Sequence, residues 1–593
     1  MSEFYGGELG PNAPLPTDVT IPQFMLDPAY THPLRPPQGD IPCFIEDATG
    51  RRVSLGEVRD RTTAVATVLK EKYKIGDGQV GERLDPKNDQ LVIDANKYSC
   101  AAPIISTTPS CCGLSPPSVE YSGMGYFLSR VFLAEQVNSG ANPSYTASEI
   151  EYQLKVTEAT FIVAHSSTLT AVLDAAKRTG LPLDRIALID APAKAPVVTL
   201  SSLVSPVLAR GAPSFSHVGI KLKPGEGATR VAMLCMSSGT TGPPKAVAIT
   251  HAAIVANMVQ MRVACLTDNP WLDKGDVVLG VLPFFHVAGL VFNLHFMIFS
   301  ATTLVVIPKF DFLAMLESIV RYRLVPPIAV ALAKHPVVRK YDLSGLKFIG
   351  CGAAPLTSEL QEQLVQLFPQ VKTGQAYGLT ETATILSMTP FHVPSSFGSV
   401  GRLIPGVRVR LVKPDGSLAG PNEPGELVVK TPSLSLGYHK NKKATEESFS
   451  ADGWFRTGDQ VVIKDNGEVW VTDRLKELIK VQGFQVSPAE LEGLILDHPD
   501  VSDTCVVGAP DDRLGEVPLA FVVLTADAEK RAKTDAEAIK TSIKKLVSDN
   551  KIRYKHLADV EFVAVIPKNA SGKILRRILT EEVRARVKSK SKL

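Results

Sequence analysis

The chain is poor in cysteine and nearly balanced in charge. Eight cysteines are scattered over 593 residues, and no two of them have the C-x-x-C spacing of a metal or redox pair. This pattern indicates free thiols in a reducing compartment. The 64 basic and 61 acidic side chains leave a formal charge of +3. So small an excess gives no reason to expect nucleic acid or an acidic membrane surface as a partner.

Long uninterrupted apolar runs are also absent, although a membrane-spanning helix needs ~20 such residues. The longest apolar region, residues 277–308, is interrupted by Pro283, His286 and Asn293. We therefore expect a buried strand, a loop, a buried helix and a second strand there, and no transmembrane segment. The N-terminus has neither a charged start nor an apolar centre, so we expect no secretory signal.

The composition, with 45% apolar and 21% charged residues, is typical of a globular protein, and the length predicts two or more domains. Strand-like segments ("ATFIVAHSS", "RIALID", "TTLVVIP") alternate with helix-like segments ("ASEIEYQLKV", "LTSELQEQLVQLF"). Alternation of this kind predicts an α/β fold. We expect an extended lead-in rich in Pro and Gly over residues 1–40, followed by a large layered α/β domain over residues 41–473.

A smaller α+β domain is predicted over residues 474–593, where the pattern changes. Ser487, Pro488 and Glu490 indicate a helix start. Ser487 can cap the helix, Pro488 suits its first position, and Glu490 can reach back to the cap.

One segment, residues 84–136, does not fit this alternation. Its part from Ser99 to Pro117 is dense in Ser, Pro and Cys, where an α/β layer should have a strand and a helix. Our hypothesis is that part of it is translated intron or a reading-frame slip; a genuine insertion is the alternative.

The stretch "SSGTTGPPKAV", which starts at Ser237, has the hydroxyls, glycines and lysine of a phosphate-binding loop. It is not a Walker loop, because Gly239 and Gly242 are too close together and Ala246 follows Lys245. The dinucleotide pattern G-x-G-x-x-G is absent as well. Alone, the stretch fits a phosphate loop and a Ser/Gly surface loop equally well.

Six further segments follow it in order: "LPFFHVAG", "GCGAAPL", "QAYGLTE", "GWFRTGD", "DRLKELIKVQGFQVSPAELE" and "PKNASGKILRR". Together with the loop they resemble the signatures of the adenylate-forming, or AMP-binding, superfamily. The resemblance covers about residues 41–588. "VPPIAVALAKHP" and "NPSYTASEIEYQLK" are similar to 4-coumarate:CoA ligase and its fungal acyl-CoA ligase relatives.

The resemblance implies an ATP-dependent carboxylic acid:CoA ligase, an AMP-forming acid-thiol ligase. A carboxylate attacks the α-phosphate of ATP to give acyl-AMP and pyrophosphate, and the CoA thiol then displaces AMP. The implied co-substrates are ATP, CoA and a small carboxylic acid, with Mg²⁺ held through ATP, in fungal secondary or acyl metabolism. The alternatives are an adenylate-forming enzyme with another acceptor, either a carrier protein or a luciferase-like reaction, and an inactive homologue.

The resemblance assigns the chemistry of adenylation to a few residues. Lys573 matches the lysine that bridges the carboxylate and the α-phosphate. Thr380 matches a phosphate contact, and Glu381 matches the glutamate that holds Mg²⁺ through ATP. Asp459 would accept both ribose hydroxyls. The remaining ATP- and AMP-binding matches are Ser237, Ser238, Gly239, Thr240, Thr241, Lys245, Gly352, Ala353, Ala354, Gln375, Ala376, Tyr377, Arg474, Lys476 and Gln485.

Family members also rotate the small domain between the two half-reactions, so the small domain is expected to be mobile. Lys476 matches the hinge, and Lys480 matches the lysine presented in the second state. The positions that match CoA contacts are Lys309, Gln482 and Gly483.

The acyl pocket is implied at His286, Ala288, Gly352 and Ala376. His286 matches the histidine at its mouth. Plant ligases have Tyr where Ala288 stands and Gly where Ala376 stands. The missing ring argues against 4-coumarate itself and for a bulkier or aliphatic acid, although pocket effects of ~1–3 kcal/mol do not name a substrate.

The last three residues are Ser-Lys-Leu, which match a peroxisomal address read by an import receptor. A basic, solvated tail is the alternative interpretation. We expect a peroxisomal location and binding to the import receptor through these residues.

Overall fold

The computed structural model describes residues 3–73, 90–94, 137–190, 196–214, 221–237, 243–266, 272–280, 282–307, 311–322, 332, 335–352, 358–390, 396–481, 484–511, 513–568 and 573–590. At residues 90–94, 336, 358–360, 485 and 587–590 only the backbone is described. Sites predicted elsewhere in the chain lie outside the described residues.

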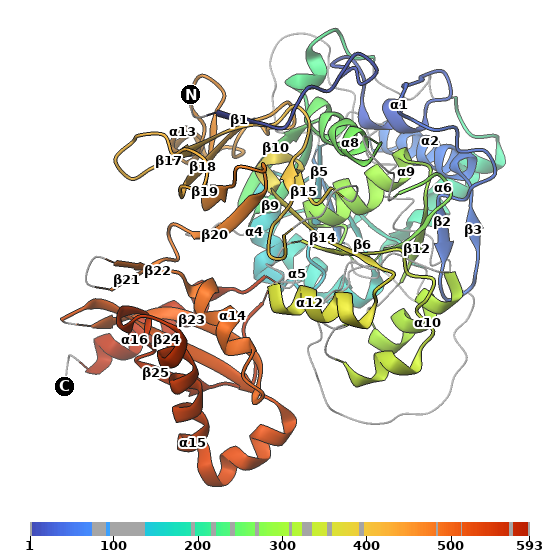
Figure 1. Cartoon of the computed structure of the whole chain (residues 1–593). Coiled ribbons are helices and arrows are strands. Elements are labelled where there is room, and N and C mark those ends of the chain that lie inside the picture. Colours follow the sequence, from blue (N-terminus) through green and yellow to red (C-terminus); the bar gives the residue numbers. More distant parts are fainter. Residues whose placement is uncertain are drawn as a thin grey trace.

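The chain forms a large N-terminal part and a smaller C-terminal part, which lies below it in Figure 1. A mixed, mostly parallel seven-stranded sheet forms one layer of the large part, in the order β10-β9-β5-β4-β6-β7-β8. Its strands are β4 (Gln90–Asp94), β5 (Val137–Ala141), β6 (Phe161–Ala164), β7 (Ile186–Leu188), β8 (Val198–Thr199), β9 (Val231–Ser237) and β10 (Lys245–Thr250).

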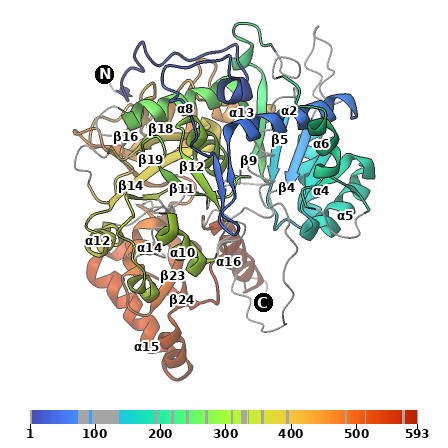
Figure 2. The same cartoon turned by 90° about the vertical axis from the view of Figure 1, so that its right-hand side faces the viewer.

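Helices cover both faces of this sheet, as expected for buried parallel strands. They are α2 (Leu55–Glu71), α4 (Ala147–Thr157), α5 (Leu169–Thr179) and α6 (Leu200–Ala209). Alternate residues of β6 point to opposite faces: Phe161 and Val163 pack with the α2 and α6 side, whereas Ile162 and Ala164 pack with α4 and α5. Figure 2 shows α4 and α5 at the right of the sheet.

Two four-stranded sheets and a five-stranded antiparallel sheet complete the large part, in the orders β11-β12-β2-β3, β13-β14-β15-β16 and β1-β17-β18-β19-β20. The first two comprise β11 (Val277–Gly280), β12 (Thr303–Val306), β2 (Phe44–Glu46), β3 (Arg52–Val53), β13 (Phe348–Cys351), β14 (Lys372–Leu379), β15 (Thr384–Met388) and β16 (Arg402–Leu403). The third comprises β1 (Glu3–Tyr5), β17 (Arg408–Val412), β18 (Gly425–Lys430), β19 (Phe455–Ile463) and β20 (Val469–Arg474). Helices α10 (Phe312–Tyr322), α12 (Ser358–Leu367) and α13 (Lys442–Ser448) belong to the same part.

The C-terminal part has its own sheet and its own core. Its elements are β21 (Ile479–Val481), β22 (Phe484–Val486), α14 (Pro488–Leu496), β23 (Val501–Asp511), β24 (Gly515–Leu524), α15 (Ala526–Asn550), β25 (Asp559–Phe562) and α16 (Arg576–Lys590). This arrangement confirms the predicted large α/β domain followed by a small α+β domain. In both views α15 points away from the large part.

The cap of α14 shows where a local prediction held and where it failed. The Ser487 hydroxyl accepts the N–H of Glu490, and Pro488 is the first helical residue, as predicted. The predicted return of the Glu490 side chain to the cap is wrong. Its carboxylate instead binds Lys551 at 2.9 Å and Lys555 at 2.6 Å, because two ammonium groups attract it more strongly than one N–H.

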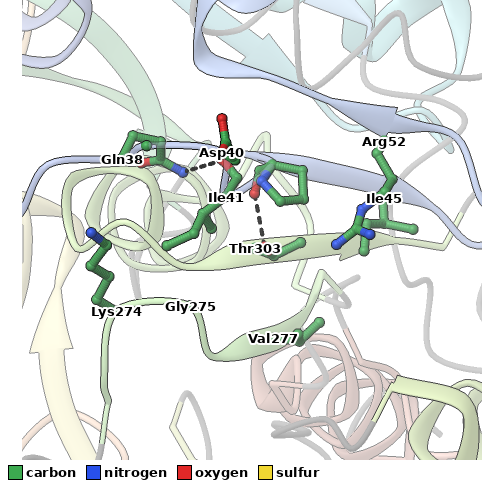
Figure 3. A pocket seen from close by; sticks show the side chains of 11 residues that line it. Gln38, Asp40, Ile41, Ile45, Arg52, Lys274, Gly275, Val277 and Thr303 are labelled. Carbon is green, nitrogen blue, oxygen red and sulfur yellow. Dashed lines mark hydrogen bonds between the residues drawn. The ribbon is translucent and has the colours of Figure 1, made fainter.

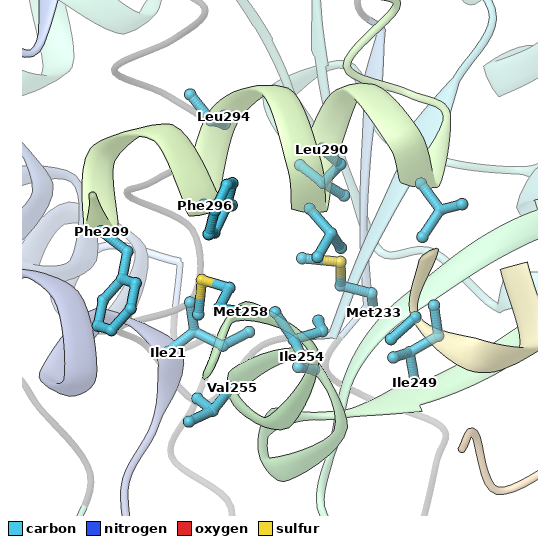
Figure 4. Packing of buried hydrophobic residues seen from close by; sticks show 14 of the residues in the cluster. Ile21, Met233, Ile249, Ile254, Val255, Met258, Leu290, Leu294, Phe296 and Phe299 are labelled. Atoms are coloured by element: carbon cyan, nitrogen blue, oxygen red, sulfur yellow. The ribbon is translucent and has the colours of Figure 1, made fainter. Parts of the chain in front are cut away.

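The apolar region 277–308 folds as predicted, with β11 and β12 on either side of a buried π-helix, η5 (Ala288–Phe296), and the short helix α9 (Met297–Phe299). The π-helix η5 packs on α8 (His251–Leu266), and side chains such as Leu290, Phe296 and Met258 fill the space between the two helices (Figure 4). Among the described helices none is long and apolar enough to cross a lipid bilayer.

The first 40 residues are more ordered than the extended lead-in that we expected. A capping box of Thr20 and Gln23 starts α1 (Ile21–Leu26), whose Phe24 stacks on Phe299 in the main core. Strand β1 pairs antiparallel with β17, and the Glu3 carboxylate of β1 forms ion pairs with Arg408 and Arg410 of β17. The segment folds because its few apolar residues match a hydrophobic surface of the large part.

The irregular segment 84–136 lies outside the described residues except for β4. That strand occupies the centre of the seven-stranded sheet, in parallel register with β5 and β6. The chain before the Cys- and Pro-rich stretch therefore supplies the strand that the α/β layer requires.

Candidate active site

The phosphate loop joins two strands whose pairing fixes its ends. Ser237 ends β9, Lys245 begins β10, and the two residues are register partners. The hydroxyl of Tyr152, on α4, donates to the carbonyl of Pro244 at 2.8 Å and holds the last turn of the loop. Ser238, Gly239, Thr240 and Thr241 lie outside the described residues.

Strands β13 and β14 form the next wall of the site. They run parallel, with Cys351 opposite Gln375, and Gly352 follows at the end of β13. The Gln375 N–H donates to the Thr389 hydroxyl at 2.9 Å, which ties β14 to the residue just after β15. Ala376 and Tyr377 continue along β14, whereas Ala353 and Ala354 lie outside the described residues.

Asp459 is a buried acid of the site, with 2% of its surface exposed. The Tyr377 hydroxyl donates to its Oδ2 at 2.6 Å, and Nε of Arg474 lies 3.1 Å from its Oδ1. Antiparallel pairing of β19 with β20 places Asp459 opposite Arg474. Burial and the neighbouring Asp459 charge raise the pKa of Tyr377 well above its usual value, so the phenol stays a donor. Each carboxylate oxygen keeps a lone pair, which suits the acceptance of two ribose hydroxyls.

Thr380 and Glu381 lie in the short 3-10 turn η7 (Thr380–Thr382) between β14 and β15. Strands β14 and β15 approach so closely that a Cβ on Gly378 would lie 1.4 Å from the Thr384 carbonyl oxygen. Thr384 has a φ of 129°, a conformation that a β-branched residue rarely adopts. Its hydroxyl donates to the carbonyl of Val287, which links this turn to the histidine motif.

His286 lies just before η5, where its Nδ1 accepts the N–H of Ala288. Burial, and secondly the charge of Lys573, lower the pKa of His286 to about 4, so its ring is neutral near pH 7. The predicted pocket residue Ala288 is the first residue of η5. The motif's Gly289 permits the turn, because a Cβ there would meet the Pro283 carbonyl oxygen at 2.0 Å.

Lys573 enters this site from the C-terminal domain. Burial, and then the positive charge of Arg474, lower its pKa to about 8, while the carboxylates of Asp459, Glu477 and Glu381 oppose that shift. Lys573 lies close enough to these groups, and to His286, for their charges to act on one another. The structure therefore brings Lys573 together with the residues predicted to bind ATP and the acid.

Two residues of this region were missed by the sequence analysis. Arg576 begins α16 three residues after Lys573 and binds Glu477 and Glu492. Tyr438 lies between Glu381 and Lys245. Arg576 belongs to the quoted "GKILRR" motif, so its position was visible. Tyr438 had a weaker signal, a tyrosine after a glycine in the Ser-rich stretch "SLSLGYHK".

The other predicted residues do not join this cluster in the described structure. Lys476 and Lys480 are exposed, and the Lys480 N–H donates to Glu516 of β24. Gln485 pairs with Lys480 through the backbone. Lys309, Gln482 and Gly483 lie outside the described residues.

A shallow hollow of about 400 Å³ lies elsewhere, between β2, β3, β11 and the preceding loops (Figure 3). Arg52 and Lys274 lie at its edges, and Ile41, Ile45 and Val277 line it. None of the predicted site residues contributes to it.

The cluster suits the transfer of a nucleotide to a carboxylate. It offers cations in Lys573, Arg474 and Lys245, a neutral His286 and a buried acid in Glu381. Among the described residues no group of three or more His, Cys, Asp or Glu side chains could hold a metal ion. A single buried carboxylate fits a hard cation that takes its other oxygen ligands from phosphate and water.

Comparison with known proteins identifies the family. The model of the family described as AMP-binding enzyme matches residues 131–439, starting near the end of the irregular segment. The model of the AMP-binding enzyme C-terminal domain matches residues 490–573. The chain is 34% identical to 4-coumarate–CoA ligase 3 of Arabidopsis thaliana over 576 residues, covering 95% of this chain and 92% of that one. It is 33% identical to 4-coumarate–CoA ligase 1 of Petroselinum crispum over 586 residues, or 96% of each chain. A 41% match to 4-coumarate–CoA ligase 2 of Oryza sativa subsp. japonica spans 59% of this chain and 62% of that one.

Solved structures share the fold. The anthranilate CoA ligase AuaEII in complex with anthranoyl-AMP superposes with a TM-score of 0.76 at 20% identity, covering 97% of this chain and 99% of that one. ATP-bound MatB from Rhodopseudomonas palustris has a TM-score of 0.74 at 24% identity, covering 92% and 96%. Taken with the matched family and the full-length relatives, the chain belongs to the AMP-binding enzymes and is a 4-coumarate–CoA ligase-like, AMP-forming acid-thiol ligase.

Proposed function

We propose that this ligase activates its acid in the arrangement described above, with Lys573 as the cation that bridges the carboxylate and the α-phosphate. Thr380, Lys245 and the phosphate loop bind the phosphates, Asp459 and Arg474 bind the ribose, and Glu381 holds Mg²⁺ through ATP. When bound, Mg²⁺ screens the phosphate charges. Transfer to CoA then requires the small domain to turn, so that Lys480 replaces Lys573.

The burial of Lys573 beside Asp459, Arg474 and Glu381 carries this proposal. A lysine loses solvation when it is buried, so an ammonium placed beside Arg474 is favoured by an anion in addition to the neighbouring carboxylates. The forming acyl phosphate would supply that anion, and fixed cations are most effective where charge develops in the transition state. Neutral His286 adds a hydrogen-bond donor at the carboxylate without repelling Lys573.

We further propose an acid that is bulkier or more aliphatic than 4-coumarate. Ala288 offers no ring to contact a phenol, and Ala376 adds one methyl group to the wall on β14. The C-terminal Ser-Lys-Leu supports a peroxisomal location. A fluorescent fusion at the N-terminus should co-localise with peroxisomes and become dispersed when residues 591–593 are deleted.

The test is a pyrophosphate-release assay with ATP and Mg²⁺ on phenylpropanoid, phenylacetic and medium- to long-chain fatty acids, each with and without CoA. Sustained turnover that depends on CoA, with an aliphatic or bulky acid preferred, supports the proposal. A preference for 4-coumarate contradicts the proposed acid class. Release that CoA does not change indicates another acceptor, such as a carrier protein.

A further inference from the structure

Tyr438 contacts two oppositely charged groups of the site at once. Its hydroxyl donates to Oε1 of Glu381 at 3.0 Å. Its ring lies under the Lys245 ammonium, with Nζ 4.7 Å from the ring centroid. A cation over an aromatic face is attracted by the ring quadrupole. The tyrosine therefore binds the predicted metal-holding acid by its edge and the phosphate-loop lysine by its face.

The backbone fixes Tyr438 in this place. Residues 435–439 run antiparallel along the open edge of β10, and Tyr438 pairs with Val247. On either side, the Ala248 N–H donates to the Gly437 carbonyl at 2.9 Å, and the His439 N–H donates to the Ala246 carbonyl at 2.7 Å. The Ser435 N–H also donates to the Glu381 carbonyl at 2.8 Å. The same short segment thus holds both the strand of Lys245 and the turn of Glu381.

The phenol is a permanent donor at this position. Burial, and secondly the Glu381 charge, raise the pKa of Tyr438 above its ordinary value. Phe449 packs edge-on against the ring at 5.9 Å and limits its rotation. Glu381 is 6% exposed, so a bond to one of its oxygens orients the other.

We infer that Tyr438 is a positioning residue of the adenylation site, which directs the second oxygen of Glu381 toward the ATP-bound cation and keeps Lys245 available to the phosphates. This inference rests on the proposed function and deepens it. Lys245 and Glu381 have opposite charges, and a direct ion pair between them would withdraw both from ATP. Tyr438 gives each of them another contact, Glu381 through its hydroxyl and Lys245 through the face of its ring.

Two substitutions separate the two contacts. Y438F removes the bond to Glu381 and keeps the ring under Lys245, whereas Y438L removes both. Y30F is the matched control, because it deletes a hydroxyl from a tyrosine that packs on Phe24 in the core, away from these groups. Binding of ATP is measured by calorimetry at several Mg²⁺ concentrations and without Mg²⁺, with no acid present. Thermal unfolding is followed in parallel.

For Y438F we expect the Mg²⁺ concentration needed for half-maximal tightening of ATP binding to rise about tenfold, the value of a hydrogen bond to a charged group. Its affinity for ATP without Mg²⁺ should stay that of the wild type. Y438L should in addition lose about three- to fivefold in Mg²⁺-free affinity, the range of a cation–π contact. Y30F should match the wild type in both measurements.

An unchanged Mg²⁺ dependence in Y438F overturns the inference. The inference is also overturned if Y438F and Y438L lose ATP affinity equally with and without Mg²⁺ and both unfold at a lower temperature. That result would indicate a structural role only. If wild type binds ATP with Mg²⁺ but activates no acid in the panel, the proposed function fails while the inference on Tyr438 stands. Failure of the wild type to bind ATP with Mg²⁺ overturns both.

Discussion

At the residue scale, burial shifts the pKa values of the site's side chains and so decides which of them are charged near neutral pH. Lys573 has a pKa of about 8, well below the ordinary value of a lysine, because it is buried and faces Arg474. His286 is neutral for the same kind of reason. The site therefore pairs one titratable cation with one uncharged ring, and only the cation changes its charge near physiological pH.

This difference predicts a pH limb for the adenylation step. The pKa of Lys573 is lowered, so the cation is present below about pH 8 and is lost as the pH rises through it. We expect kcat/KM for pyrophosphate formation to fall above pH 8, and thioester formation from preformed acyl-AMP to lack that limb. K573A should lower the adenylation rate by about 100- to 1,000-fold.

The matched control for K573A is K568A, because Lys568 lies on the same segment and pairs with Asp503. A limb that persists in K573A, or an adenylation rate that stays within twofold of wild type, would show that another group carries the charge.

At the element scale, short turns between strands place most of the site. Turn η7 carries Thr380 and Glu381, and it is possible only because β14 and β15 nearly touch at Gly378. The loop that carries His286 depends in the same way on Gly289. In each case a glycine permits a close backbone approach that any Cβ would prevent.

The substitution G378A should therefore destabilise the large domain and displace Glu381. An added Cβ 1.4 Å from a backbone oxygen forces the strands apart, and overpacking of this kind costs about 1–3 kcal/mol. G56A is the control, since Gly56 lies in the first turn of α2, where an added Cβ would make only ordinary contacts, at 3.7 Å from the Ser54 hydroxyl and 3.8 Å from the Arg59 guanidinium. We expect that substitution to be neutral or to stabilise by about 0.5–1 kcal/mol. Chemical denaturation measures both, and equal stabilities of the two variants would contradict the expectation.

At the scale of the whole molecule, two separately folded cores meet around one site. The C-terminal domain contributes Lys573, and the chain between β20 and β21 connects the two cores through Lys476. The backbone hydrogen bonds described at this connection come from Leu475, which donates to the Gly458 carbonyl, and from Glu477 and Leu478, which both donate to the Arg474 carbonyl. A proline at 476 therefore removes none of these bonds while it restricts rotation of the chain.

If the small domain must turn between half-reactions, K476P should keep pyrophosphate formation near the wild-type rate and slow the CoA step at least about tenfold. Stopped-flow measurement of each half-reaction separates the two rates. K476A keeps the freedom of the chain and should behave as wild type in both. A K476P enzyme with an unimpaired CoA step would show that rotation about this residue is unnecessary.

The sequence by itself determined the family, the order of the two domains and most elements of the core, because ordered motifs and hydrophobic periodicity are local properties of the chain. Residues 277–308 folded as their pattern predicted, and the motifs alone selected Lys573, Asp459 and Glu381, whose roles stay predictions. Only the tertiary structure decided which charges meet. Tyr438 and Arg576 bind partners that are far away in sequence. The Glu490 carboxylate binds Lys551 and Lys555 instead of the helix cap, and the first 40 residues pack on a core formed by later parts of the chain. These outcomes depend on burial and long-range contacts, which create the electrostatics of the site and have no local signature.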